Sequence, residues 1–199
     1  IDYGRSLAQY GGLPTLLRAL PPGRRKALHT AVNEGRGGSD TLDVAVLDVL
    51  TRRHAADVAR ESAARARERG ARWSAVLLAE SCLPVAEVRE RLLAATRRPA
   101  AEDRAEAWPL LIRNAARWGD PADVTAVLRD MERLRNEQDP VRSAALRALA
   151  DTRAALFTED AAPHLDRIAG DAVEARDSSP ETRRRLSALA VAVLREHAA

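Results

Sequence analysis

A short pattern recurs along this chain at nearly constant spacing. Its clearest copy is Asp139–Ala150, which reads DPVRSAALRALA. Arg104, Ala107, Trp108 and Leu111 lie 38 positions before Arg142, Ala145, Leu146 and Leu149, and Leu186–Ala190 lies 40 positions after Leu146–Ala150. Self-similarity at this period is typical of stacked helical hairpins, each of which buries its apolar face on its neighbours. The chain is therefore predicted to be a helical repeat protein.

Apolar residues elsewhere follow the same helical spacing. Val85, Val88, Leu92 and Leu93 fall on one helical face, and Val124, Val127, Leu128, Met131 and Leu134 fall on another. No stretch alternates apolar and polar residues over the length of a strand. We predict an all-α fold with helices over residues 71–81, 84–96, 102–118, 121–136, 140–154, 159–175 and 180–197. The last two core faces are predicted to be Leu165, Ile168, Ala169, Ala172 and Val173, and Leu186, Leu189, Ala190, Val193 and Leu194.

Helix boundaries carry their own signals. Asp120-Pro121, Asp139-Pro140 and Ser179-Pro180 each place a side-chain acceptor at the N-cap and proline at the first helical position. Thr158 with Glu159 and Asp160 predicts one more helix start. Glycine predicts stops or kinks at Gly70, Gly119 and Gly170, and Pro109 is expected to kink or split the helix over 102–118.

The N-terminal part is less regular. Residues 13–20 and 24–32 predict a hairpin across Pro21-Pro22-Gly23, residues 33–39 predict a glycine-rich loop, and residues 42–50 and 55–69 predict the next hairpin. We therefore divide the chain into residues 1–40, an atypical N-terminal repeat or cap, and residues 41–199, the helical repeats. The start at Ile1 rather than Met favours a piece of a longer repeat protein.

The segment Asp139-Pro140-Val141-Arg142, followed by Ala145 and Leu149, resembles the second helix of a HEAT repeat in the ARM/HEAT superfamily. The resemblance implies a right-handed α-solenoid of stacked antiparallel hairpins. It also implies that Asp103, Arg104, Asp139 and Arg142 belong to a structural ladder between adjacent repeats. The segment Ser179–Arg183 lacks the aspartate of the pattern, which interrupts the expected ladder there.

The same resemblance places function on the outward positions of the second helices, which line the concave surface of such solenoids. Aligning the repeats assigns these positions to Arg113, Arg117, Arg147, Asp151, Arg184 and Ser187. We predict that this set binds a partner, with the arginines pairing to acidic groups. The alternative is that these residues form a charged face that is exposed to solvent and binds no partner.

Arginine dominates the basic residues, since Lys26 is the only lysine among 32 basic residues, against 29 acidic ones. The arginine fork suits phosphate, so nucleic acid is a candidate partner. A GC-rich genome explains the same bias more simply, because lysine, asparagine, isoleucine and tyrosine are scarce together. The densest basic run, Arg60–Arg72, is interrupted by Glu61 and Glu68 and has no interleaved aromatic residues for stacking, so a solvated helix face is favoured.

Residue sets that would indicate catalysis are missing from the sequence. Cys82 stands alone among apolar neighbours and is interpreted as a core thiol. The histidines have no metal-ligand spacing, and no serine is arranged with His and Asp as a nucleophile. Trp108 and Trp73 are interpreted as core residues and Trp118 as the most exposed tryptophan. HEAT-like alkylpurine DNA glycosylases place Asp one turn after Trp, and Leu77, Ile112 and Ala122 occupy those positions here.

These patterns favour a non-enzymatic scaffold that binds a protein partner along an extended helical surface. No metal, cofactor or membrane association is expected, because the chain lacks the ligand sets and any apolar run long enough to span a bilayer. The single cysteine favours the cytoplasm, and the composition favours a bacterial source. A nucleic-acid-binding HEAT-like protein, with or without base-modifying chemistry, is the alternative.

Overall fold

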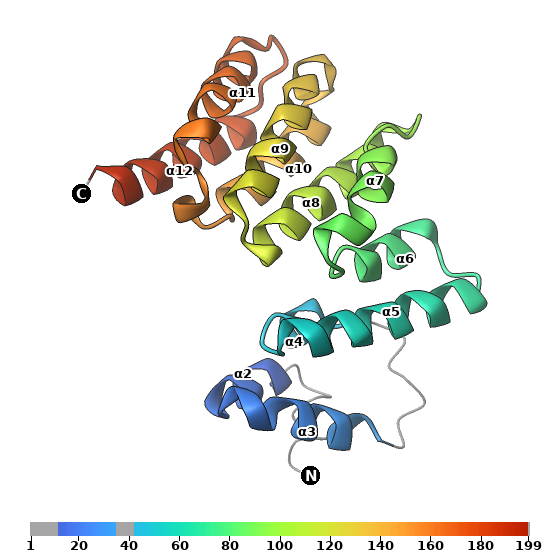
Figure 1. Cartoon of the computed structure of the whole chain (residues 1–199). Coiled ribbons are helices and arrows are strands. Elements are labelled where there is room, and N and C mark those ends of the chain that lie inside the picture. The colour runs from blue at the N-terminus through green and yellow to red at the C-terminus, as the bar shows by residue number, and fades with distance from the viewer. Residues whose placement is uncertain (1–11, 35–41, 199) are drawn as a thin grey trace. The chain divides into compact units, whose positions relative to one another are not determined.

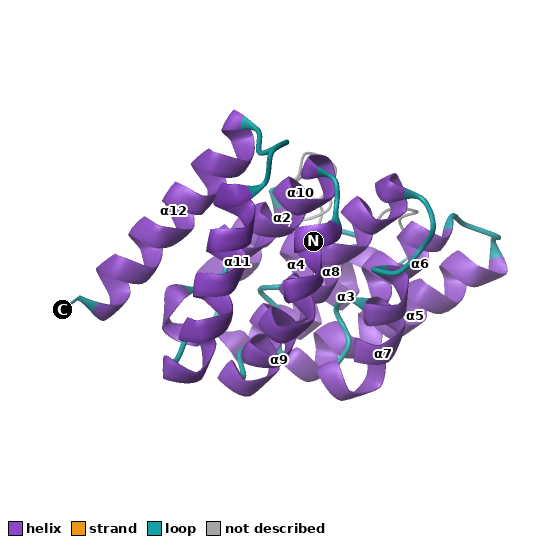
Figure 2. Cartoon of the chain, turned by 90° about the horizontal axis from the view of Figure 1, so that it is seen from above, coloured by secondary structure: helices purple, strands orange, loops and turns teal. Residues whose placement is uncertain are grey.

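The fold is all-α, as predicted. The computed structural model describes residues 12–34 and 42–198, and within these ranges the regular elements are helices, with no strand (Figure 2). The chain divides into two compact units, residues 1–83 and 84–199. The division expected at residue 40 stays a prediction, because residues 35–41 lie outside the described ranges.

In its described residues, 12–34 and 42–83, the first unit contains two helical hairpins and a single helical turn (Figure 1). Its elements are α2 (Leu13–Ala19), α3 (Pro22–Asn33), α4 (Val44–Leu47), α5 (Arg52–Glu68) and α6 (Trp73–Glu80). The hairpin predicted across Pro21-Pro22-Gly23 is present as α2 and α3, which contact each other. The helix expected over residues 42–50 is shorter than predicted: it is the one turn α4, where Asp43 Oδ1 accepts from the backbone N–H of Ala45 and Val46.

Small residues build much of the core of this unit. On α5 the buried positions are the alanines 55, 56, 59, 63 and 66, which allow close helix approach. Leu17 of α2 and Val32 of α3 are fully buried. Glu80 of α6 is buried and forms an ion pair with Arg67 of α5, so the α5–α6 hairpin is joined by charge as well as by apolar contact. Cys82 is buried, as expected for a core thiol.

The second unit is a series of helices in which α8, α10 and α12 pack one after another (Figure 1). Its elements are α7 (Val85–Ala95), α8 (Ala101–Trp118), α9 (Pro121–Met131), η1 (Glu132–Asn136), α10 (Asp139–Ala150), η2 (Ala154–Leu156), η3 (Glu159–Ala161), α11 (Ala162–Glu174) and α12 (Pro180–His197). Helix α7 packs on α8, α9 contacts α8 and α11, and α11 contacts α12. The predicted helices of residues 71–197 are therefore all present, with shifted ends.

Several predicted boundaries are confirmed and others are wrong. Asp120 and Ser179 cap α9 and α12, accepting from the backbone N–H of Ala122 and Thr182. Gly70 and Gly119 end α5 and α8 with φ of 63° and 73°, values that favour glycine. Pro109 does not split α8, which continues through it, and Gly170 does not stop α11, so at both residues only the alternative of a kink stays a prediction. Asp139 is not an N-cap: it begins α10 itself, and its carboxylate is engaged by α12.

The predicted core faces hold in α7 and α9 and fail at the outer side of the last two helices. Val88, Leu92, Val127 and Leu128 are buried to 3% exposure or less, whereas Val173 of α11 and Leu194 of α12 are 65% and 63% exposed. Ala190 is exposed too, and Leu165, Ala169, Leu186 and Val193 are half-buried. Helix α12 packs against α10, α11 and η2, and these contacts leave its far side uncovered.

Candidate partner-binding surface

A half-buried arginine, Arg104, joins α8 to the segment that leads into α10. Arg104 Nε donates to both carboxylate oxygens of Glu137, at 2.9 and 3.0 Å, and its Nη2 donates to Oε2 at 2.8 Å. Its Nη1 donates to the backbone oxygens of Arg98 and Pro99 at 2.9 and 2.7 Å. One guanidinium therefore bonds its own preceding loop and a carboxylate 33 residues further along the chain.

Arg142 repeats this arrangement one hairpin later. Its Nη1 donates to the backbone oxygen of Glu137 at 2.8 Å, five residues back, as Arg104 does to Pro99. Its Nη2 donates to Asp177 Oδ1 at 2.5 Å, in the segment that leads into α12. Arg142 is 2% exposed, whereas the side chain of Asp177 is 55% exposed, so a buried guanidinium bonds a carboxylate at the surface. The two arginines thus form equivalent links, from α8 to the α10 segment and from α10 to the α12 segment.

Asp139 completes the second link. Its Oδ1 accepts from the Thr182 hydroxyl at 2.8 Å and from the Ser179 backbone N–H at 3.1 Å, while its own N–H donates to Asp177 at 3.0 Å. Ser179 and Thr182 lie 40 positions after Asp139 and Arg142, so they occupy the same repeat positions in α12. The ladder was expected to be interrupted at Ser179. It continues there instead, because Ser179 and Thr182 both donate hydrogen bonds to Asp139 of α10.

The charges in these links are stabilised by their partners. Burial would raise the pKa of Asp139, but hydrogen bonds from Ser179 and Thr182 and the charge of Arg142 outweigh it, so the pKa lies below its usual value. The hydrogen bond from Arg142 lowers the pKa of Asp177 in the same way. The bond to Glu137 raises the pKa of Arg104. Each of these groups is held in its charged form, as an ion-pair ladder requires.

Asp103 does not take part in the ladder. Its Oδ2 accepts from Arg98 Nε at 2.7 Å, within the same turn of the chain. The ladder role that the resemblance implies for Asp103 is therefore wrong, since its carboxylate closes the loop before α8 and does not reach a neighbouring hairpin. Arg104, Asp139 and Arg142 do join successive hairpins.

The residues predicted to bind a partner lie on α8, α10 and α12, with Asp151 directly after α10, and none of them takes part in the ladder. Arg113 and Arg117 are one turn apart near the end of α8, Arg147 lies on α10, and Arg184 and Ser187 are one turn apart on α12. Arg113 and Asp151 are 38 positions apart, and Arg147 and Ser187 are 40 apart, so both pairs occupy equivalent repeat positions. We call the six residues the outward surface: Arg113, Arg117, Arg147, Asp151, Arg184 and Ser187.

The structure brings two members of the outward surface into contact. Arg113 Nη2 and Asp151 Oδ2 are 4.0 Å apart, bridging α8 and the end of α10, with side chains 48% and 58% exposed. Arg184, 74% exposed, pairs with Glu181 on its own helix. Arg147 and Ser187 are exposed and Arg117 is half-buried. Among the described residues Arg147 has no ion-pair partner. Exposed pairs of this kind contribute little to stability, about 0–1 kcal/mol, and can exchange partners at low cost.

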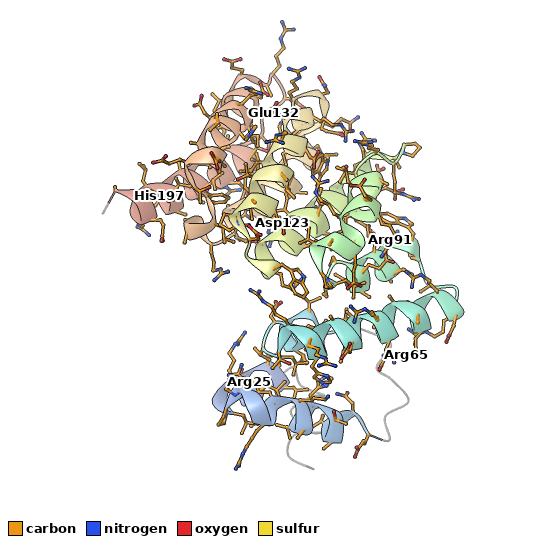
Figure 3. All side chains as sticks on the ribbon, in the orientation of Figure 1. Arg25, Arg65, Arg91, Asp123, Glu132 and His197 are labelled. Carbon is orange, nitrogen blue, oxygen red and sulfur yellow. The ribbon has the colours of Figure 1, made fainter. Side chains whose placement is uncertain are left out.

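A second set of links ties together the helices that precede α8, α10 and α12. Glu132 of η1 accepts from His164 Nδ1 at 2.7 Å and from Arg167 Nη1 at 2.6 Å, both on α11 (Figure 3). The hydrogen bond from His164 is the largest cause that lowers the pKa of Glu132. Arg89 of α7 pairs with Asp130 of α9. These contacts are the arrangement expected of a structural framework.

Charge elsewhere is neutralised locally in much the same way. In the basic run of α5, Arg60 pairs with Asp57 and Arg65 with Glu61, as the mixed pattern predicted. Trp108 is completely buried, in agreement with its predicted core role, while Trp73 and Trp118 are both half-buried, so Trp118 does not stand out as exposed. In the described ranges no group of three or more His, Cys, Asp or Glu residues is placed to hold a metal ion. None of the described helices has the length and apolar character to cross a membrane.

The sequence interpretation missed the acceptors of the ladder. Glu137 and Asp177 lie just before the helices they serve, and neither belongs to the HEAT pattern from which the ladder residues were chosen. Their 40-residue spacing was the available signal, since it matches the spacing of Asp139 and Ser179. The contact between His29 and His54 was missed as well, because they are 25 positions apart and belong to no repeat.

The chain matches no known family model, no curated protein and no solved structure. Its function therefore has to be argued from its own residues.

Proposed function

We propose that residues 84–199 form a short α-solenoid of HEAT-like repeats, and that the protein is a non-enzymatic scaffold whose outward surface binds a protein partner. The observation that carries the proposal is the repetition of one polar link. Arg104 and Arg142 make equivalent bonds in consecutive hairpins, each to the loop before its own helix and to the carboxylate before the next one. A link that repeats with the sequence period is what a stack of equivalent units requires.

The ladder leaves the outward surface available for binding. It links α8, α10 and α12 through Arg104, Arg142 and their partners, and the six residues of the outward surface take no part in these bonds. Arg113, Arg147 and Arg184 occupy neighbouring turns of the aligned repeats, and helices that present them rigidly would lose little conformational freedom on binding. Arginine at the centre of an interface can bind a carboxylate with two parallel hydrogen bonds. An acidic face of a folded protein, or of a helix, is the partner that this chemistry fits.

Local neutralisation favours a protein partner over nucleic acid. Arg60, Arg65, Arg113 and Arg184 each have an acidic neighbour within ion-pair distance, and the net charge of the chain is only +3. Phosphate binding would need an excess of unpaired positive charge along one path. In the second unit Trp108 and Phe157 are buried, which removes them as platforms for stacking bases.

The discriminating experiment compares two kinds of ligand on the same protein. Fluorescence anisotropy is recorded with labelled single-stranded and duplex DNA and RNA, and with labelled helical peptides selected by display against the full chain. The proposal expects no salt-sensitive nucleic-acid binding at 150 mM salt. It also expects selected peptides to be acidic and to lose at least tenfold in affinity with Arg113→Ala/Arg147→Ala/Arg184→Ala. Micromolar nucleic-acid binding that weakens steeply with salt would contradict it.

A further inference from the structure

We propose that His29 and His54 form a pH-sensitive latch, which holds α3 against α5 while the pair is neutral and releases it when the pair takes up protons. His29 Nδ1 and His54 Nε2 are 3.2 Å apart, with ring centroids 5.1 Å apart and the ring planes at 81°. The two rings therefore share one hydrogen bond between helices that are separated by the whole of α4 and its loops.

Protonation of both rings removes this bond. A neutral imidazole has one N–H and one lone pair, so two neutral rings can donate and accept in turn. An imidazolium has no lone pair. A doubly protonated pair would place two N–H groups and two positive charges face to face at this distance. His29 is only 9% exposed, so water cannot readily solvate its charge while α3 stays in place.

The surrounding charges do not stabilise the protonated form of His29. Burial and then the charge of His54 lower the pKa of His29 to about 4. Burial and the nearby Lys26 of α3 lower the pKa of His54, although Asp57 and Glu61 on α5 oppose this shift. In the opened form both rings would return toward the ordinary value of 6.5. Proton uptake is therefore favoured by opening.

A neighbouring contact keeps its strength over the same pH range. Arg25 of α3, which is labelled in Figure 3, donates from Nε to the backbone oxygen of Leu20 and from Nη1 to that of Val49, both at 2.9 Å. Arginine does not change its charge over the pH range in which histidine titrates. Helix α3 is therefore held by the histidine contact, which depends on pH, and by the Arg25 contact, which does not. Release of α3 would uncover Leu17 and Val32, which are fully buried when it is closed.

The direction and size of the effect follow from linkage. Both pKa values are lower in the closed form, so the latch has its full strength above pH 6.5 and weakens as the pH falls from there toward 4. For His29 alone, a pKa of 6.5 when open and about 4 when closed makes the opening constant about 30-fold larger at pH 5 than at pH 8.

Hydrogen exchange of the full chain at pH 8 and pH 5, corrected for intrinsic rates, tests the proposal. We expect protection in residues 13–33 to fall about 30-fold or more at pH 5, while residues 139–150 of the second unit keep theirs. The double variant His29→Asn/His54→Gln replaces the bonding nitrogens with amides that do not titrate, so its protection in residues 13–33 should be the same at both pH values. The matched control His197→Gln removes an exposed histidine and should behave as the wild type.

Three results would overturn the latch. One is unchanged protection of residues 13–33 in the wild type. Another is an equal loss in residues 13–33 and 139–150, which would indicate general acid destabilisation. The third is pH dependence that persists in the double variant. If that variant does not fold, NMR titration of the wild-type ring signals decides: titration of both rings near pH 6.5 contradicts the proposal, and titration of one of them well below it supports the proposal.

Discussion

Arg142 and Asp177 lie 35 positions apart in the chain and are joined by a hydrogen bond of 2.5 Å, with the guanidinium buried and the carboxylate at the surface. Arg104 and Glu137 make the equivalent contact one hairpin earlier. The pairing converts a sequence repeat into a physical register between helices. It also makes these arginines poor candidates for partner binding, because Nε, Nη1 and Nη2 of Arg104 and both terminal nitrogens of Arg142 already donate inside the fold.

Removing the guanidinium of Arg142 should destabilise the second unit. Arg142→Met keeps the apolar stem but leaves Asp139 without its cation and the Glu137 backbone oxygen without a donor. We expect a loss of about 3 kcal/mol in the free energy of unfolding, the low end for a broken buried pair, because Asp177 is exposed. Urea unfolding followed by circular dichroism measures it. Arg147→Met, on the exposed side of the same helix, should cost no more than about 0.5 kcal/mol. Equal effects from the two variants would refute the ladder.

Acid should weaken the same link. The pKa of Asp139 is lowered from 3.8 in the folded chain, so its contribution is complete above that value and is lost as the pH falls through the folded pKa. Asp139→Asn keeps an acceptor oxygen and removes the titration. Between pH 5 and pH 3 the melting temperature of the wild type should therefore fall further than that of the variant, in thermal melts of both. Parallel curves would show that the Asp139 carboxylate does not contribute.

Two glycines offer a matched test of backbone conformation. A Cβ added to Gly70 or to Gly170 meets no atom within 4 Å, so a substitution at either site adds no clash. Gly70 has φ of 63° and Gly170 lies inside α11. Gly70→Ala should destabilise by about 1 kcal/mol, from strain in the left-handed region. Gly170→Ala should stabilise by about 0.5–1 kcal/mol, from helix propensity. Thermal melts measure the change in melting temperature of each variant. A change of the same sign in both variants would contradict the assigned conformations.

Trp108 should be the most sensitive aromatic position. It is completely buried, and its Nε1 has no hydrogen-bond partner among the described residues. Trp108→Ala should cost about 3–5 kcal/mol through the cavity that it leaves. Trp108→Phe should cost clearly less, because it loses volume but no hydrogen bond. Denaturant midpoints of the two variants measure the difference. If Phe were as damaging as Ala, the indole N–H would have a bonding role.

The repeat spacing was sufficient to predict the helices of the second unit and the buried positions of α7 and α9. Those predictions rest on local periodicity and on proline and glycine signals, which act within a few residues. Asp139 shows where such reasoning fails. Its position before proline is typical of an N-cap, but the Thr182 hydroxyl and the Ser179 N–H compete for its carboxylate, and they come from another helix. Long-range partners cannot be found from a local motif.

The outer residues of α11 and α12 show a related limit. Val173 and Leu194 have the spacing of core residues, yet both are largely exposed, because burial depends on whether a further element packs on that side. Periodicity identifies an apolar face and does not say what covers it. For the outward surface, the sequence placed its residues on α8, α10 and α12, but it did not predict the pair between Arg113 and Asp151. Whether the set binds a partner stays a prediction.

Site-specific photocrosslinking tests that central claim most directly. A photoreactive residue is placed at Arg147 or Ser187 of the outward surface, and as a control at the exposed Arg129 of α9, in the full chain irradiated in extract from its source cells. The account predicts one discrete protein adduct at 147 and 187, absent at 129 and lost when Arg113→Ala and Arg184→Ala are added. Adducts to nucleic acid, or protein adducts that form equally at all three positions, would contradict it.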